Sequence, residues 1–185
     1  MAEVLILYST VDGQTRRICD ALTEIIGGAG HDVTLSALTG DESMDLERYD
    51  LVVVGASVRY GHHRKAVRRF IESNAAILGR KRGALFSVNL VARNPEKRRP
   101  DSNPYLVKLL RQIPWTPNYL CVFAGRLDYS MYGFWDRLII RLIMKITHGP
   151  TDVTRIEYTD WNSVNDFGGL LVNAADEIAS GLAEV

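Results

Sequence analysis

The stretch VLILYSTVDGQT, residues 4–15, joins an apolar run to a short loop of small and polar residues. Val4 to Tyr8 is apolar without alternation, which is typical of a strand buried on both faces of a parallel sheet. The next segment, residues 14–26, has apolar residues at a helical period and ends at Gly27 and Gly28. A strand, a tight loop and a helix in this order indicate the first unit of an α/β fold.

The same alternation continues along the chain. Strands are predicted at 33–38, 51–56, 84–90 and 119–125, and helices at 65–78, 102–112 and 160–183, with Asp160 as the N-cap of the last helix. This order predicts a doubly wound five-stranded parallel sheet with helices on both faces. Because the chain has 185 residues, we expect one domain, residues 1–185, with an inserted helical segment at about 126–153 near the last strand.

The loop STVDGQT, residues 9–15, carries hydroxyl groups and backbone N–H groups at the positive end of the first helix. Phosphates bind well at such a position. The loop lacks both the GxxxxGK[ST] pattern of nucleoside triphosphate hydrolases and the GxGxxG pattern of dinucleotide-binding folds, so a monophosphate fits best. The alternative is that Ser9, Thr10 and Thr15 only cap the helix.

Two later strands end in similar loops, GASVRYG at residues 55–61 and SVNL at residues 87–90. In open parallel sheets the carboxyl ends of the strands meet at one edge, and ligands bind there. The three loops are therefore predicted to form one site, which favours a bound ligand over helix capping alone.

The loop after the first strand, together with those after the third and fourth strands, resembles the FMN-binding loops of flavodoxin-like proteins. Four longer runs resemble the quinone-dependent protoporphyrinogen IX dehydrogenases of bacterial haem biosynthesis within that superfamily. They are GASVRYGHHRKA (55–66), SVNLVARNPEKRRP (87–100), RLIIRLIMKITHGPTD (137–152) and EYTDW (157–161). The resemblance covers essentially the whole chain and implies a flavodoxin-like fold.

The resemblance implies FMN as cofactor, protoporphyrinogen IX as substrate, and menaquinone or ubiquinone as electron acceptor, in the penultimate step of haem biosynthesis. It assigns the FMN phosphate to Ser9, Thr10, Asp12, Gly13, Gln14 and Thr15, one side of the flavin to Ala56, Ser57, Val58, Arg59, Tyr60 and Gly61, and the other side to Ser87, Val88, Asn89 and Leu90. No protein nucleophile, general base or metal is implied, because the redox chemistry belongs to the cofactor.

One departure from electron-carrying flavodoxins concerns the flavin faces. Those proteins usually enclose the ring between two aromatic residues, whereas this chain offers Tyr60 in one loop and only Asn89 and Leu90 in the other. The open face leaves room for a substrate. Arg59 and Arg93 are our candidates for binding its propionates, because a guanidinium pairs bidentately with a carboxylate.

Basic residues follow both later loops, and the simplest interpretation is that they form a solvated surface. They are Arg59, His62, His63, Arg64, Lys65, Arg68, Arg69, Arg93, Lys97, Arg98 and Arg99. An anionic ligand is the alternative, because the cations come from two loops at one edge of the sheet. The two histidines could relay protons, but we expect them to be solvated.

Two other enzyme or carrier functions stay open. An NAD(P)H:quinone oxidoreductase has the same fold, although no feature of this sequence indicates a nicotinamide site. A non-catalytic FMN electron-transfer protein is the second, but such proteins are usually acidic, whereas this chain has 22 basic and 22 acidic residues. Nucleic-acid binding is disfavoured by the neutral net charge and by the lack of an aromatic stacking pattern beside the basic loops.

The stretch FWDRLIIRLIMKI, residues 134–146, predicts a helix with a narrow cationic stripe and a wide apolar surface. It is too short to cross a bilayer but suits an interfacial position on an anionic membrane. Burial of its whole apolar surface is the alternative. With no signal peptide at the N-terminus, we expect a peripheral protein on the cytoplasmic face of the inner cell membrane. Whether it forms a homo-oligomer is left open.

Overall fold

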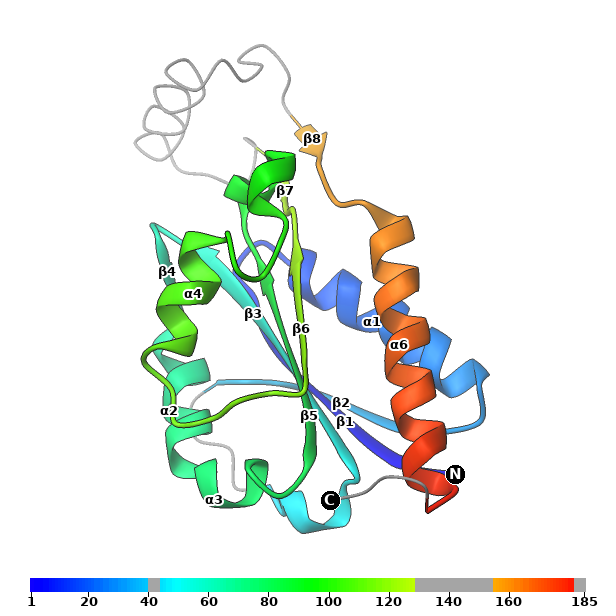
Figure 1. Ribbon diagram of the computed structural model, residues 1–185. Helices are drawn as coiled ribbons and strands as arrows, with labels where there is room; N and C mark the ends of the chain where they lie inside the picture. The colour runs from blue at the N-terminus through cyan, green and yellow to red at the C-terminus, as the bar shows by residue number, and fades with distance from the viewer. Residues whose placement is uncertain (40–43, 129–154, 182–185) are drawn as a thin grey trace.

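The computed structural model describes residues 1–39, 44–128 and 155–181 (Figure 1). The predicted helix at 134–146 and most of the predicted insertion at 126–153 lie outside these residues.

The sheet has five parallel strands in the order β2-β1-β3-β5-β6, and β1 pairs with β2 on one side and with β3 on the other (Figure 1). The strands are β1 (Glu3–Ser9), β2 (Asp32–Ala37), β3 (Leu51–Arg59), β5 (Arg82–Val88) and β6 (Tyr119–Phe123). The strand order reverses at β1, which places a topological switch point between β1 and β3. The predicted doubly wound five-stranded sheet is confirmed.

Helices cover both faces of this sheet (Figure 1). On one face lie α1 (Gln14–Gly28) and α6 (Trp161–Ala179), and on the other lie α2 (Lys65–Ser73), α3 (Ala75–Leu78) and α4 (Pro104–Leu110). Short 3-10 turns occupy Leu46–Arg48 (η1), Leu90–Arg93 (η2) and Pro95–Lys97 (η3). Asp160 caps α6 as predicted, since its carboxylate accepts the N–H groups of Asn162 and Ser163. The helix predicted at 65–78 is two helices, because Asn74 interrupts the regular backbone.

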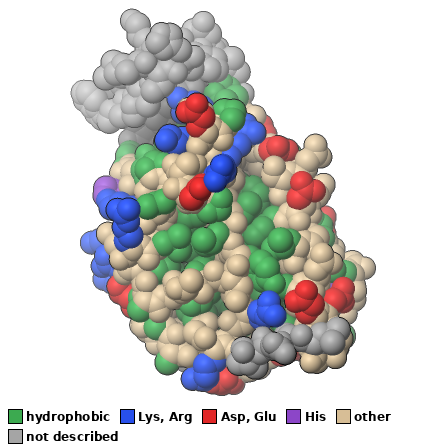
Figure 2. Space-filling view, viewed as in Figure 1, with side chains coloured by type: hydrophobic (Ala, Val, Ile, Leu, Met, Phe, Trp, Pro, Cys, Tyr) green, Lys and Arg blue, Asp and Glu red, His purple; other side chains and the backbone are tan. Residues whose placement is uncertain are grey.

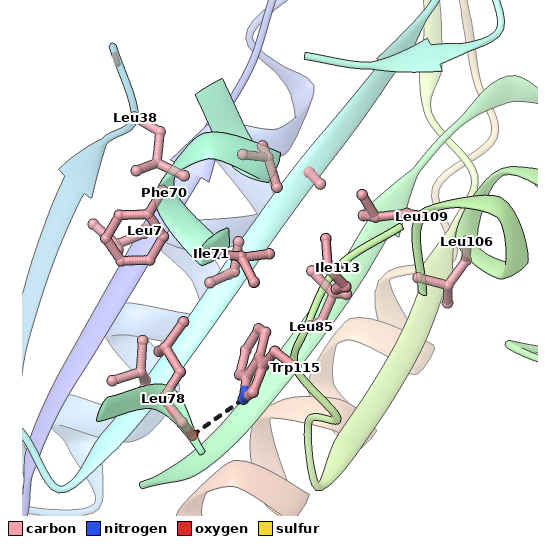
Figure 3. Close-up of a cluster of buried hydrophobic side chains, with 14 of the residues drawn as sticks. Leu7, Leu38, Phe70, Ile71, Leu78, Leu85, Leu106, Leu109, Ile113 and Trp115 are labelled. Carbon is pink, nitrogen blue, oxygen red and sulfur yellow. Dashed lines mark hydrogen bonds between the residues drawn. The ribbon is translucent and has the colours of Figure 1, made fainter. Parts of the chain in front are cut away.

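Each face of the sheet has its own core. The core on the α2 and α4 side includes Leu7, Leu85, Ile71 and Trp115 (Figure 3). There the Trp115 indole N–H donates to the carbonyl of Leu78 at 3.2 Å. On the α1 and α6 side, the rings of Phe86, Phe123 and Phe167 meet edge to face, with centroids 5.4 to 6.1 Å apart. A Cβ on Gly55 would lie 2.4 Å from the Phe86 ring, so a glycine in β3 makes this packing possible.

Two short antiparallel pairs extend the fold beyond the predicted elements. β3 turns at Tyr60 and Gly61 into β4 (His62–His63), and both turn residues have positive φ, 50° and 76°, as a type I′ hairpin requires. β7 (Arg126–Asp128) pairs with β8 (Arg155–Glu157). The sequence pattern predicted neither pair. The second one joins the two ends of the segment predicted as an insertion.

Candidate functional site

The loop between β1 and α1 is shaped to leave the start of the helix open. The Thr10 hydroxyl accepts the N–H of Gly13 at 3.0 Å, and Gly13 takes a left-handed φ of 77° immediately before α1. No side chain caps α1, so Ser9, Thr10 and Thr15 do not act as its caps. The backbone N–H groups of the first turn are thus directed at the carboxyl edge of the sheet, where they can bind an anion.

Two serines at this edge carry buried hydroxyl groups for which the described residues supply no hydrogen-bond partner. Ser9, at the end of β1, is 1% exposed, and Ser57, in β3, is 9% exposed. They are close in the sheet, because Ser9 pairs with Ala56 in the register of β1 and β3. Leaving a buried hydroxyl unpaired is unfavourable, so both positions suit a ligand with acceptor oxygens. A phosphate group fits this requirement together with the open helix start.

Three arginines from different elements hold the phosphate loop from outside. Arg59 of β3 forms an ion pair with the Asp12 carboxylate at 2.8 Å. Arg64, which precedes α2, donates to the carbonyl of Thr10 at 3.1 Å, and Arg126 of β7 donates to the carbonyl of Asp12 at 3.4 Å. The guanidinium groups fix the loop and make the potential around it positive. Arg64 was predicted only as one of the basic residues that follow the second loop, and Arg126 was not predicted.

The side chain of Gln14 has a structural role that its position in the loop did not reveal. Its amide donates to Glu157 of β8 at 2.6 Å and to the hydroxyl of Thr159 at 2.9 Å, and it accepts from Arg17 at 3.0 Å. The Thr159 hydroxyl in turn donates to the carbonyl of Ala124, after β6, at 2.7 Å. A phosphate would therefore meet the backbone N–H of Gln14 rather than its amide. Glu157 and Thr159 lie in the run EYTDW, which gave no sign of this contact.

The hairpin formed by β3 and β4 supplies one wall of the site. Tyr60 stands at its tip and is 67% exposed, with the Arg59 guanidinium over its ring at 5.1 Å. His62 is exposed and donates from Nδ1 to the carbonyl of Tyr60 at 2.8 Å. Arg59, predicted to bind a substrate carboxylate, is already paired with Asp12 in this structure. A ligand carboxylate would compete with Asp12 for it.

The loop after β5 supplies the opposite wall, mainly through backbone and Leu90. The predicted flavin-lining residue Asn89 is only 3% exposed and points inward, where its side chain accepts the N–H of Ala92 at 3.1 Å. Leu90 is partly exposed at the start of η2, and its carbonyl accepts from Arg93 at 3.3 Å. No aromatic side chain lies on this wall between Ser87 and Arg93, as the sequence indicated.

His63 differs from the solvated residue that we expected. It is partly buried at the base of the hairpin, and its Nε2 lies 2.9 Å from the Ser87 hydroxyl. Burial lowers the pKa of His63 to about 4 from its ordinary 6.5, so the ring is neutral at physiological pH. A partly buried, neutral imidazole suits a fixed hydrogen-bonding role.

Some of the predicted basic residues form ion pairs or hydrogen bonds with neighbouring residues, and others lie on the surface. Figure 2 shows Lys and Arg side chains gathered along the side of the molecule that carries β4 and α2. Arg68 pairs with Glu72 along α2, and Arg99 pairs with Asp101 at 2.6 Å. Arg98 donates to the carbonyl of Ala92 at 3.1 Å. Part of the basic character therefore stabilises the loops themselves.

Comparison with known proteins identifies the family. The family model for the flavodoxin domain matches residues 5–154. The chain is 41% identical over 176 residues to the protoporphyrinogen IX dehydrogenase [quinone] of Escherichia coli K12, covering 95% of this chain and 97% of that protein. The chain belongs to the family of these flavodoxin-domain protoporphyrinogen IX dehydrogenases. A protoporphyrinogen IX dehydrogenase [quinone] of Leishmania major is 39% identical over 165 residues, which cover 88% of this chain and 71% of that protein.

Solved flavodoxins share the fold of this protoporphyrinogen dehydrogenase family member at low sequence identity. Oxidised flavodoxin 1 of Bacillus cereus superposes with a TM-score of 0.56 at 14% identity, covering 93% of this chain and 98% of that chain. Two-electron reduced flavodoxin of Megasphaera elsdenii gives a TM-score of 0.51 at 17% identity, covering 64% of this chain and 84% of that chain. The family model and these structures indicate a flavin cofactor. Within residues 1–39, 44–128 and 155–181, no helix has the length and apolar character needed to cross a membrane.

Proposed function

We propose that this protein oxidises protoporphyrinogen IX to protoporphyrin IX with bound FMN and passes the electrons to a membrane quinone, menaquinone or ubiquinone. The observation that carries the proposal is the 41% identity to the Escherichia coli enzyme over nearly the full length of both chains. The departures from electron-carrying flavodoxins support it, because one wall of the site lacks an aromatic residue and three arginines surround the phosphate loop.

We assign the FMN phosphate to the open start of α1 and the hydroxyls of Ser9, Thr10, Thr15 and Ser57. When bound, FMN supplies the two-electron chemistry, and the protein supplies binding and orientation. The walls that would flank the flavin are the hairpin of Val58 to Gly61 and the loop of Val88 to Leu90. In the second wall Val88 is 5% exposed, so its backbone is packed into the sheet.

We assign substrate recognition to the positively charged side chains at this edge of the sheet. The substrate carries two propionates, and the positive potential at this edge of the sheet attracts them. Arg59 is the first candidate partner, since its guanidinium lies between the hairpin wall and the phosphate loop. Arg93, beside the opposite wall, is the second. Binding of a propionate by Arg59 would replace the contact with Asp12.

We also propose that the protein is peripheral on the cytoplasmic face of the inner membrane, through the predicted helix at 134–146. Exchanging Ile139 and Ile143 for Gln should then reduce binding to anionic lipid vesicles while FMN binding is retained. Unchanged vesicle binding would count against this attachment.

An anaerobic reduction experiment tests the proposed activity. The purified flavoprotein is mixed with protoporphyrinogen IX or with NADPH, and the visible absorbance of the flavin is followed. We expect prompt bleaching by protoporphyrinogen, recovery of colour on addition of quinone, and no reaction with NADPH. Bleaching by NADPH alone would favour an NAD(P)H:quinone oxidoreductase, and bleaching by neither would favour an electron-transfer protein.

A further inference from the structure

A buried chain of hydrogen bonds links the start of α4 to the hairpin wall of the site. It runs from Asn103, the N-cap of α4, through Asn89 and Ser87 to His63. Asn103 and Ser87 are fully buried, and Asn89 is nearly so. The members come from both walls, because His63 lies in β4 and Ser87 and Asn89 lie at the end of β5.

The direction of each bond follows from the backbone groups at the far end. The side-chain oxygen of Asn103 accepts the N–H groups of Tyr105 and Leu106, both at 3.2 Å. Its amide nitrogen must therefore donate, and it does so to the carbonyl of Lys97 at 2.8 Å and to the side-chain oxygen of Asn89 at 3.2 Å.

The same reasoning determines the donor and acceptor roles of Asn89 and then of Ser87. The oxygen of Asn89 accepts the N–H of Ala92, so its amide nitrogen donates, to the Ser87 hydroxyl at 3.0 Å and back to the side-chain oxygen of Asn103 at 3.3 Å. The Ser87 oxygen therefore acts as an acceptor toward Asn89, and its own hydrogen needs an acceptor. Among the described residues only Nε2 of His63, at 2.9 Å, can take it. Nε2 then carries no proton, and the neutral ring holds its proton on Nδ1.

We propose that this chain makes His63 a positioning residue of the cofactor site, locked in the Nδ1–H tautomer and holding the β3–β4 hairpin against the loop after β5. His63 pairs with Val58 in the hairpin, and Ser87 immediately precedes Val88 in the other wall. The pairing of β3 with β5 ends at Ser57 and Val88, and the bond between His63 and Ser87 adds a side-chain link from β4 to β5 at that point. The inference rests on the proposed function only in taking FMN as the ligand between them.

The tautomer is measurable in flavin-free protein. Nitrogen-15 NMR of histidine-labelled protein at neutral pH should show the His63 ring, identified as the signal that is lost in His63→Phe, protonated on Nδ1 and not on Nε2. Ser87→Ala removes the donor to Nε2 and should shift His63 toward the Nε2–H form. An Nε2–H tautomer of His63 in the unmodified protein would overturn the inference.

A second measurement concerns the site itself. His63→Phe keeps an aromatic ring but removes the acceptor, whereas His63→Gln can still accept from Ser87, and His62→Phe makes the matched change at the exposed neighbour. We expect the FMN dissociation constant to rise about tenfold, and the midpoint potential of bound FMN to move, in His63→Phe only. Equal values in the two phenylalanine variants would refute the positioning role. If the unmodified protein bound no FMN, the proposed function would fail, and the tautomer measurement would still decide this inference.

Discussion

Replacing Ser9 with Ala should change the stability of the flavin-free protein and its affinity for FMN in opposite directions. The Ser9 hydroxyl is buried at the end of β1 without a partner among the described residues. An unsatisfied buried hydroxyl costs about 1–3 kcal/mol, and the exchange removes only one oxygen atom from the packing. We therefore expect flavin-free Ser9→Ala to be at least as stable as the parent protein, with a gain of up to about 1 kcal/mol.

In the FMN complex the same hydroxyl would donate to a phosphate oxygen. A hydrogen bond to a charged group contributes about 1.5–3 kcal/mol, which corresponds to an increase of about 10- to 100-fold in the FMN dissociation constant of the variant. Ser57→Ala should behave in the same way, because its hydroxyl is also buried and unpartnered. A serine that only supported the fold would instead lower stability and leave FMN affinity unchanged.

Urea denaturation of the flavin-free protein gives the free energy of unfolding, and quenching of FMN fluorescence gives the dissociation constant. Ser73→Ala, at the exposed end of α2, is the matched control and should alter neither quantity. If Ser9→Ala destabilised the flavin-free protein by more than 1 kcal/mol and bound FMN normally, the assignment of the phosphate site would be refuted.

Three further predictions follow from single contacts. Gly55→Ala would force a methyl group against Phe86 and should lower the free energy of unfolding by about 1–3 kcal/mol in urea denaturation. Arg59→Ala should raise the KM for protoporphyrinogen IX about tenfold and weaken FMN binding by a smaller factor, because the same guanidinium holds the phosphate loop through Asp12. Arg68→Ala, on exposed α2, should match the parent, and equal KM values would exclude Arg59. Because burial lowers the pKa of His63 to about 4, the unfolded chain binds the proton first as pH falls from 6.5. Stability should therefore drop by up to about 3 kcal/mol between pH 6.5 and 4 in the parent protein and not in His63→Phe, and parallel curves would contradict this.

The parallel sheet was predictable because its strands are buried on both faces and so read as unbroken apolar runs. The hairpin at Tyr60 and Gly61 was not, because tyrosine at positive φ is uncommon and a Tyr-Gly pair is not a usual turn signal. The loop positions at the sheet edge followed from strand order alone, and the structure brings the loops after β1, β3 and β5 to one edge as expected.

Side-chain directions within these loops depended on partners far away in the sequence. Asn89 turns inward because Asn103, 14 residues later, takes its side-chain oxygen. Gln14 is held by Glu157, 143 residues away, and Asp12 by Arg126, 114 residues away. Local sequence patterns contain no signal for such long-range pairs. The residue types in the loops therefore indicated the class of ligand, and the tertiary contacts decided which atoms of those residues face it.

These distant contacts bear on the proposed attachment to a membrane. β7 and β8 pair with each other, and both contact the phosphate loop, through Arg126 to Asp12 and through Glu157 to Gln14. The chain between these strands, which includes the predicted interfacial helix at 134–146, therefore starts and ends beside the cofactor site. In this arrangement a segment that attaches to a lipid surface would also set the distance between that surface and the flavin. The same two strands would then serve both the cofactor and the approach of a quinone from the membrane.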